Sequence, residues 1–128
     1  MTPTPASSEA IALAATEAAR DKQATDVVVL DMAELLSITD YFVICSASSS
    51  PQLKSVIEAV QERLRTELDL RPVRREGDGE SGWWLLDYID VVVHVFGEEE
   101  RAYYDLERLW RDAPRPAWAI EGAARSAR

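Results

Sequence analysis

The sequence predicts a single α/β domain in which a mixed β-sheet is flanked by helices. The chain has 128 residues, enough for one compact core but too few for two ordinary domains. Short β-branched and aromatic runs alternate with amphipathic helical patterns along the chain. The composition, 47% hydrophobic and 29% charged, is typical of globular proteins. We expect the domain to span residues 7–111, between a flexible N-terminal tail of residues 1–6 and a mostly flexible C-terminal tail of residues 112–128.

The first half of the chain predicts two helices and two buried strands. Ser7 or Ser8 can cap a helix that ends near residues 22–24. Residues 26–30 and 41–46 are apolar runs of strand length, joined by a connection over residues 31–38. Ser50 followed by Pro51 predicts the N-terminus of a second helix, which continues to about Leu68.

The second half predicts the rest of the sheet and a terminal helix. Residues 70–75 are expected to form a short strand, so that strand, helix and strand make a right-handed crossover between parallel strands. Three glycines in residues 76–82 predict a surface loop. Residues 83–86 and 91–96 are expected to pair antiparallel around a corner at residues 87–90. A helix over residues 99–110 should pack on the sheet through Tyr103, Leu106 and Trp110.

Charge and cysteine content narrow the classes of function. A formal charge of −9 disfavours direct, specific nucleic-acid binding, which depends on Lys and Arg neutralising phosphates. An acidic domain can instead be steered to a basic protein, although acidity for solubility alone explains the charge equally well. The single cysteine, Cys45, lies in an apolar run and is expected to be buried. With no apolar run of membrane-spanning length, the sequence predicts a cytoplasmic protein.

Two carboxylates and the only histidine, Asp87, Asp90 and His94, are the candidates for metal or acid–base chemistry. Strand alternation puts His94 between apolar neighbours, and a working site would need ligands from a second strand. We therefore favour a hydrogen-bonded structural histidine and expect no cofactor.

Alternation along the strand also separates the two neighbouring tryptophans. Trp83, Leu85 and Asp87 should point to one face of the sheet, and Trp84, Leu86 and Tyr88 to the other. Either helices cover both faces, or one indole belongs to a protein interface.

Four segments follow one another along the chain: DVVVLD at 26–31, SITDYFVICS at 37–46, WLLDYIDVVVHVF at 84–96 and YYDLERLW at 103–110. Together they resemble the ribosomal silencing factor family, which is related to Iojap. The resemblance implies a homodimeric domain similar to the nucleotidyltransferase fold without its catalytic carboxylates. It implies a non-enzymatic translational repressor that binds large-subunit ribosomal protein number fourteen and blocks subunit joining under nutrient limitation.

Trp83, Asp87, Asp90 and His94 match positions of the family's central strand motif. Our leading hypothesis places partner binding on the exposed strand face, at Trp83, Leu85, Asp87 and nearby Tyr104, and gives structural roles to Asp90, His94, Tyr103 and Trp110. Ile89 and Ala47 stand where the family usually has glycine, so we expect negative φ at both positions. The alternative hypothesis is a metal-dependent nucleotidyltransferase or hydrolase that uses Asp87, Asp90 and His94.

Overall fold

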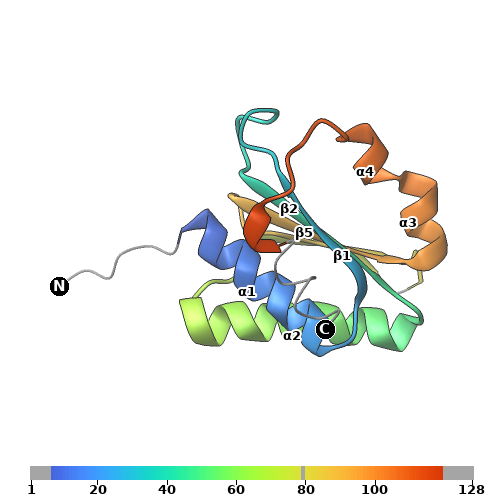
Figure 1. Cartoon of the computed structure of the whole chain (residues 1–128). Helices are drawn as coiled ribbons and strands as arrows, with labels where there is room; N and C mark the ends of the chain where they lie inside the picture. The colour runs from blue at the N-terminus through green and yellow to red at the C-terminus, as the bar shows by residue number, and fades with distance from the viewer. Residues whose placement is uncertain (1–6, 79, 120–128) are drawn as a thin grey trace.

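A five-stranded mixed sheet, with strand order β1-β2-β5-β4-β3, is the centre of the structure (Figure 1). The computed structural model describes residues 7–119 apart from residue 79. Only β2 and β5 pair in parallel, and the other neighbouring strands are antiparallel. This confirms the predicted mixed α/β class. The strands are β1 (Thr25–Asp31), β2 (Tyr41–Ala47), β3 (Arg74–Asp78), β4 (Trp83–Asp87) and β5 (Val91–Gly97).

Two helices, α1 (Ser8–Asp21) and α2 (Ser50–Leu68), cover one face of this sheet (Figure 1). The Ser7 side chain accepts a hydrogen bond from the Ala10 amide, and the Ser49 side chain accepts one from Gln52. The cap of α2 is therefore Ser49, one residue before the predicted Ser50. Alanines on α1 allow close approach to the larger aliphatic stripe of α2. The helix residues of this core are Ile11, Ala12, Ala14, Ala15, Ala18, Ala19, Leu53, Val56, Ile57, Val60 and Leu64.

The opposite face is covered only in part, by the β1–β2 connection and by two short helices. These are α3 (Glu98–Tyr104) and α4 (Leu106–Leu109), where one helix over 99–110 was predicted. Asp105 lies between them with φ of 46°, a left-handed conformation that ends α3. The break lets Leu106 and Trp110 pack on a second apolar cluster. Tyr103 is 83% exposed, so the prediction that it packs on the sheet is wrong.

Edge strand β3 begins later than the sequence indicates. It spans Arg74–Asp78 rather than residues 70–75, and the turn that follows is correspondingly shorter than the predicted loop over 76–82. Its direction is parallel to β2, but β5 and β4 lie between them. The crossover through α2 thus joins parallel strands that are not neighbours.

The segment after α4 folds back against the sheet and α1. The Asp31 amide donates a 2.7 Å hydrogen bond to the Pro114 carbonyl, and the Trp118 ring packs edge-on against Tyr41. Ala119 is buried, so the packed part of the chain extends beyond residue 111. The tails expected at residues 1–6 and 120–128 lie outside the described residues.

The helix-covered core should dominate stability. Leu64 of α2 is fully buried, so Leu64→Ala removes apolar burial and leaves a cavity, and we expect a loss of about 3 kcal/mol. Leu109→Ala is the matched control, because Leu109 is 67% exposed and its loss should change stability by less than about 0.5 kcal/mol. Urea unfolding followed by circular dichroism measures both, and equal losses would contradict this account of the core.

Candidate functional site

The β4–β5 hairpin presents a sheet face that α1 and α2 do not cover. Its register places Trp83 opposite Phe96 and Leu85 opposite His94. Trp83, Leu85 and Asp87 share this face with β5 residues of the second cluster, whereas Leu86 and Tyr88 are buried with the helices. The alternation predicted for the two tryptophans is therefore present. The helices cover the Trp84 side, where the Arg75 guanidinium lies 4.2 Å from the ring centroid.

Aromatic rings follow one another across this uncovered face, and we call them the aromatic cluster: Phe42, Trp83, His94, Phe96 and Tyr104. Trp83 is stacked on Phe96 with ring centroids 6.3 Å apart, and Tyr104 is 5.8 Å from Phe96. Trp83 is half-buried and Tyr104 is 53% exposed, so the cluster reaches the surface at these two residues. Leu85 and Asp87 continue the same face toward the hairpin turn.

His94 is the buried polar member of the cluster. Its ring lies 5.0 Å from Phe42 and 6.4 Å from Trp83, and desolvation by this environment lowers its pKa to about 4. The imidazole is therefore neutral near pH 7. Among the described residues, neither ring nitrogen has a hydrogen-bond partner. Its burial among apolar side chains agrees with the strand alternation, but the predicted hydrogen bond is absent from this part of the chain.

Of the two carboxylates in the enzymatic hypothesis, Asp87 lines one hollow with His94, whereas Asp90 does not. The Asp87 carboxylate accepts a 2.8 Å hydrogen bond from the Ile89 amide. It also forms an ion pair with Arg74 at 3.3 Å. Asp90 is exposed in the turn, where its carbonyl accepts hydrogen bonds from the amides of Asp40 and Tyr41. No group of three His, Cys, Asp or Glu side chains within the described ranges could hold a metal ion. The second ligand set that this alternative needs is missing there.

The hairpin turn contains an unexpected backbone conformation at Ile89. Its φ is 74°, whereas negative φ was predicted, so that prediction is wrong. A β-branched residue is a genuine outlier in this region, where glycine is favoured. The Asp87 carboxylate and the Tyr88 carbonyl hold the turn through the amides of Ile89 and Asp90. Ala47 has no positive φ, as expected.

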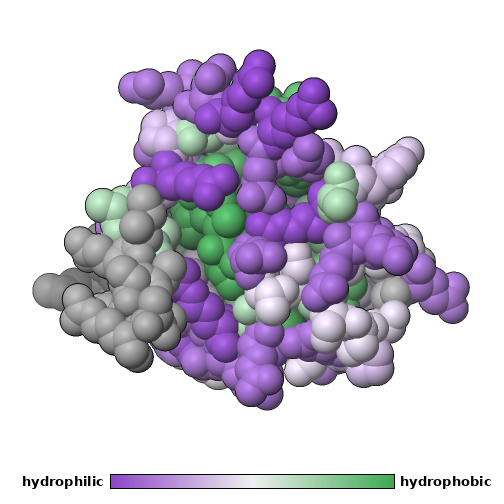
Figure 2. Space-filling model, turned by 45° about the vertical axis from the view of Figure 1, so that its right-hand side comes forward, coloured by the Kyte–Doolittle hydropathy of each residue, from purple (hydrophilic) through white to green (hydrophobic). Residues whose placement is uncertain are grey.

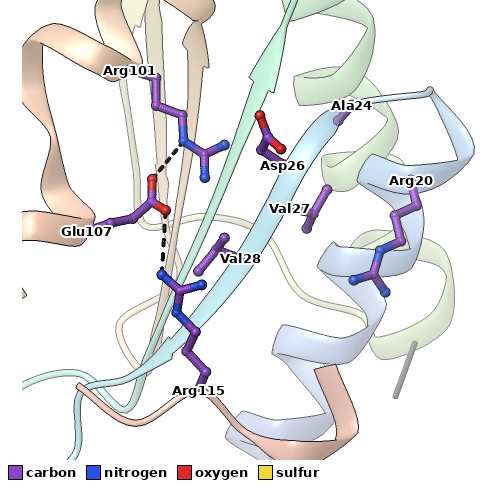
Figure 3. Close-up of a pocket in the computed structure, with 8 residues that line it drawn as sticks. All are labelled: Arg20, Ala24, Asp26, Val27, Val28, Arg101, Glu107 and Arg115. Atoms are coloured by element: carbon purple, nitrogen blue, oxygen red, sulfur yellow. Dashed lines mark hydrogen bonds and ion pairs between the residues drawn. The ribbon is translucent and has the colours of Figure 1, made fainter. Parts of the chain in front are cut away.

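A separate open hollow of about 700 Å³ lies beside β1 (Figure 3). Glu107 pairs there with Arg101 at 2.8 Å and with Arg115 at 3.7 Å. Arg101 also donates a 2.9 Å hydrogen bond to the Ser46 hydroxyl. One carboxylate thus links α3, α4 and the C-terminal segment, which is a tertiary contact that the sequence pattern did not indicate.

Hydrophilic side chains dominate the molecular surface in the view of Figure 2, and apolar ones show mainly in recesses. Exposed isoleucines depart from this pattern: Ile38 is 78% and Ile89 is 57% exposed. Sequence reasoning missed both. Ile38 lies between the polar residues Ser37 and Thr39, and Ile89 lies in the predicted corner at residues 87–90, and these turn positions were the available signal. Cys45, in contrast, is fully buried as predicted, and desolvation raises its pKa to about 12.

Fold and surface together define a small mixed-sheet α/β domain with a half-exposed aromatic face. The family model for "Ribosomal silencing factor during starvation" matches residues 5–128. The chain belongs to the ribosomal silencing factor family.

Relatives and solved structures agree with this assignment. The chain is 41% identical to ribosomal silencing factor RsfS of Bacillus subtilis over 100 residues, covering 78% of this chain and 84% of the relative. It is 35% identical over 104 residues to the chloroplastic protein Iojap of Zea mays, covering 80% of this chain and 44% of that longer protein. A crystal structure of a Chromobacterium violaceum protein superimposes with a TM-score of 0.78 at 33% identity, covering 88% of this chain and 92% of that one.

The matching family model and the Bacillus subtilis relative are both named for silencing of the ribosome. The family assignment therefore supports a ribosome-associated regulatory factor. Across the described residues, no helix combines the length and apolar character needed to cross a membrane.

Burial of neutral His94 makes stability depend on pH. Because the folded pKa is about 4 and the unfolded value about 6.5, the unfolded state binds more protons between them. The contribution, on the order of 3 kcal/mol, is fully present above pH 6.5 and is lost as the pH falls toward 4. In His94→Phe this histidine-specific loss should disappear. Urea unfolding of both proteins at several pH values between 4.5 and 7.5 measures the difference, and parallel curves would contradict it.

Proposed function

We propose that this protein binds the large ribosomal subunit through ribosomal protein number fourteen and thereby blocks joining of the small subunit. It would act in the cytoplasm and repress translation under nutrient limitation. The observation that carries the proposal is membership of the ribosomal silencing factor family over nearly the whole chain. The half-exposed aromatic face then supplies a surface on which such a partner can dock.

The net charge of the chain supports binding to a basic partner. The chain carries 23 acidic and 14 Lys and Arg residues, for a net charge of −9. Complementary charge accelerates diffusional encounter with a basic surface and suppresses binding to acidic ones. A ribosomal protein lying on RNA is a basic surface of this kind. The same net charge disfavours direct RNA binding, so the proposal assigns the contact to protein.

The aromatic cluster supports docking at one face. Trp and Tyr concentrate binding energy in protein interfaces, since each offers a large apolar area at low conformational cost. Trp83 and Tyr104 lie 6.3 Å apart at the surface end of the cluster. Leu85 and Asp87 extend the same face, and we propose these four side chains as the partner-binding set.

A homodimer is part of the proposal, and it rests on the family alone. Asp90, His94 and Trp110 are proposed to have structural roles, as the turn contacts of Asp90 and the burial of His94 suggest. Analytical ultracentrifugation at micromolar concentration tests the dimer independently of ribosome binding.

Trp83→Ala tests the docking face. Loss of a central indole anchor should weaken binding to large subunits by about 2 kcal/mol or more, roughly thirtyfold. Co-sedimentation with purified large subunits measures the affinity, and a gradient assay of subunit joining measures the functional consequence. Wild-type protein should reduce assembled ribosomes, and the variant should do so only at much higher concentration.

Two further variants make this result interpretable. Trp83 also packs on Phe96, so circular dichroism must show that Trp83→Ala is folded, and Tyr104→Ala removes an exposed ring of the same face with less effect on the core. Leu13→Ala, on α1 at the opposite face, is the control and should bind normally. Full binding by folded Trp83→Ala and Tyr104→Ala would remove this face from the interface.

A further inference from the structure

Helix α3 carries Tyr104, the exposed ring of the proposed docking face, but has little apolar anchorage of its own. All seven residues of α3 are described, and none of its apolar side chains is buried. Tyr104 is 53% exposed, and its ring centroid lies 5.8 Å from Phe96 and 6.3 Å from Trp83. Apolar burial therefore does not explain the orientation of this helix, and its polar contacts must contribute.

Arg101 supplies such contacts. Its side chain is only 11% exposed. Its Nη1 donates a 2.9 Å hydrogen bond to the Ser46 hydroxyl and a 3.5 Å hydrogen bond to the Thr25 carbonyl. Its Nε pairs with the Glu107 carboxylate at 2.8 Å (Figure 3). One guanidinium thus joins α3 to β1, β2 and α4.

The position of Arg101 in the helix connects these contacts with Tyr104. Residues three apart are neighbours on a helix surface, so Arg101 and Tyr104 project from the same side of α3. A rotation of α3 that broke the contacts of Arg101 would also move the Tyr104 ring relative to the aromatic cluster. The guanidinium resists such a rotation, because an unpaired charge withdrawn from water is costly. The left-handed Asp105 ends α3 and lets Glu107 return to Arg101.

We propose that Arg101 is a positioning residue for the docking face, and that its contacts with Ser46 and Glu107 hold Tyr104 in the orientation that the ribosomal partner binds. This rests on the proposed function and adds a residue outside the partner-binding set. Arg101 itself lines the hollow beside β1 and acts through Tyr104. Its effect on binding is therefore expected only while Tyr104 is present.

Arg101→Met tests this dependence. It keeps a long unbranched side chain, and Glu107 retains Arg115 as a partner. Binding to purified large subunits should weaken by about fivefold or more in co-sedimentation. In a Tyr104→Ala background the same change should add less than about twofold, because the two residues act through one contact. Arg101→Lys keeps the charge but can replace only one of the two contacts, so it should restore part of the affinity. Equal losses in both backgrounds would overturn the inference.

Near-ultraviolet circular dichroism tests the positioning without ribosomes, because it reports the packing of aromatic rings. The difference between wild type and Tyr104→Ala defines the contribution of this ring, and Arg101→Met should reproduce most of it. Arg115→Met is the matched control, since it removes the same charge from the same cluster. Arg115 is 52% exposed and lies 3.7 Å from Glu107, so this variant should keep the wild-type spectrum and affinity.

Ser46→Ala covers the case in which Arg101→Met does not fold. It removes the 2.9 Å hydrogen bond from the other end and should change the spectrum in the same direction. Its affinity should fall about twofold, again only with Tyr104 present. Wild-type spectra and affinity in the folded variants overturn this inference and leave the proposed function standing. Failure of the wild-type protein to bind large subunits overturns the proposed function, and the spectra then support or overturn the positioning of Tyr104 on their own.

Discussion

The parallel pairing of β2 with β5 is the constraint on which the rest of the structure depends. It joins residues 41–47 to 91–97, seven matched positions that lie about fifty residues apart in the chain. Because both are inner strands, their side chains contribute to both faces of the sheet. One set, including Val43, Val93 and Val95, belongs to the core under α1 and α2. The alternate set, including Ile44 and Phe96, belongs to the second cluster and brings His94 and Phe42 together.

Elements whose pattern reflects burial could be predicted from the sequence. Strands β1, β2, β4 and β5 and helix α2 have apolar periods that match their environments, and the separation of Trp83 from Trp84 follows from strand alternation alone. Edge strand β3 could not be placed, because its Arg- and Glu-rich sequence has no strand pattern of its own. Its limits are set by pairing with β4.

Tertiary contacts explain the remaining differences between the predicted and the observed structure. The helix predicted over 99–110 breaks at Asp105, whose short polar side chain tolerates positive φ, and the break allows Leu106 and Trp110 to reach the second cluster. At Ile89, residue type argued for negative φ, but the turn held by Asp87 imposes the opposite sign. Neither choice is visible in local propensity, since both depend on what the flanking segments contact. For the candidate site, strand alternation predicted which side chains share a face, whereas the contacts of Phe96 with Trp83 and Tyr104 depend on the fold.

The two faces differ in a way that separates stability from recognition. The helix face consists largely of fully buried aliphatic side chains, whereas the other face holds the buried imidazole of His94 and the strained backbone of Ile89. These features each cost stability, so a chain selected for stability alone would lose them. A partner that packs on Ile89 and on the half-exposed Trp83 and Tyr104 rings would bury apolar surface on binding. Net negative charge would then govern how fast a basic partner arrives, and the apolar face would govern how long it stays, because most affinity differences between related interfaces arise in dissociation.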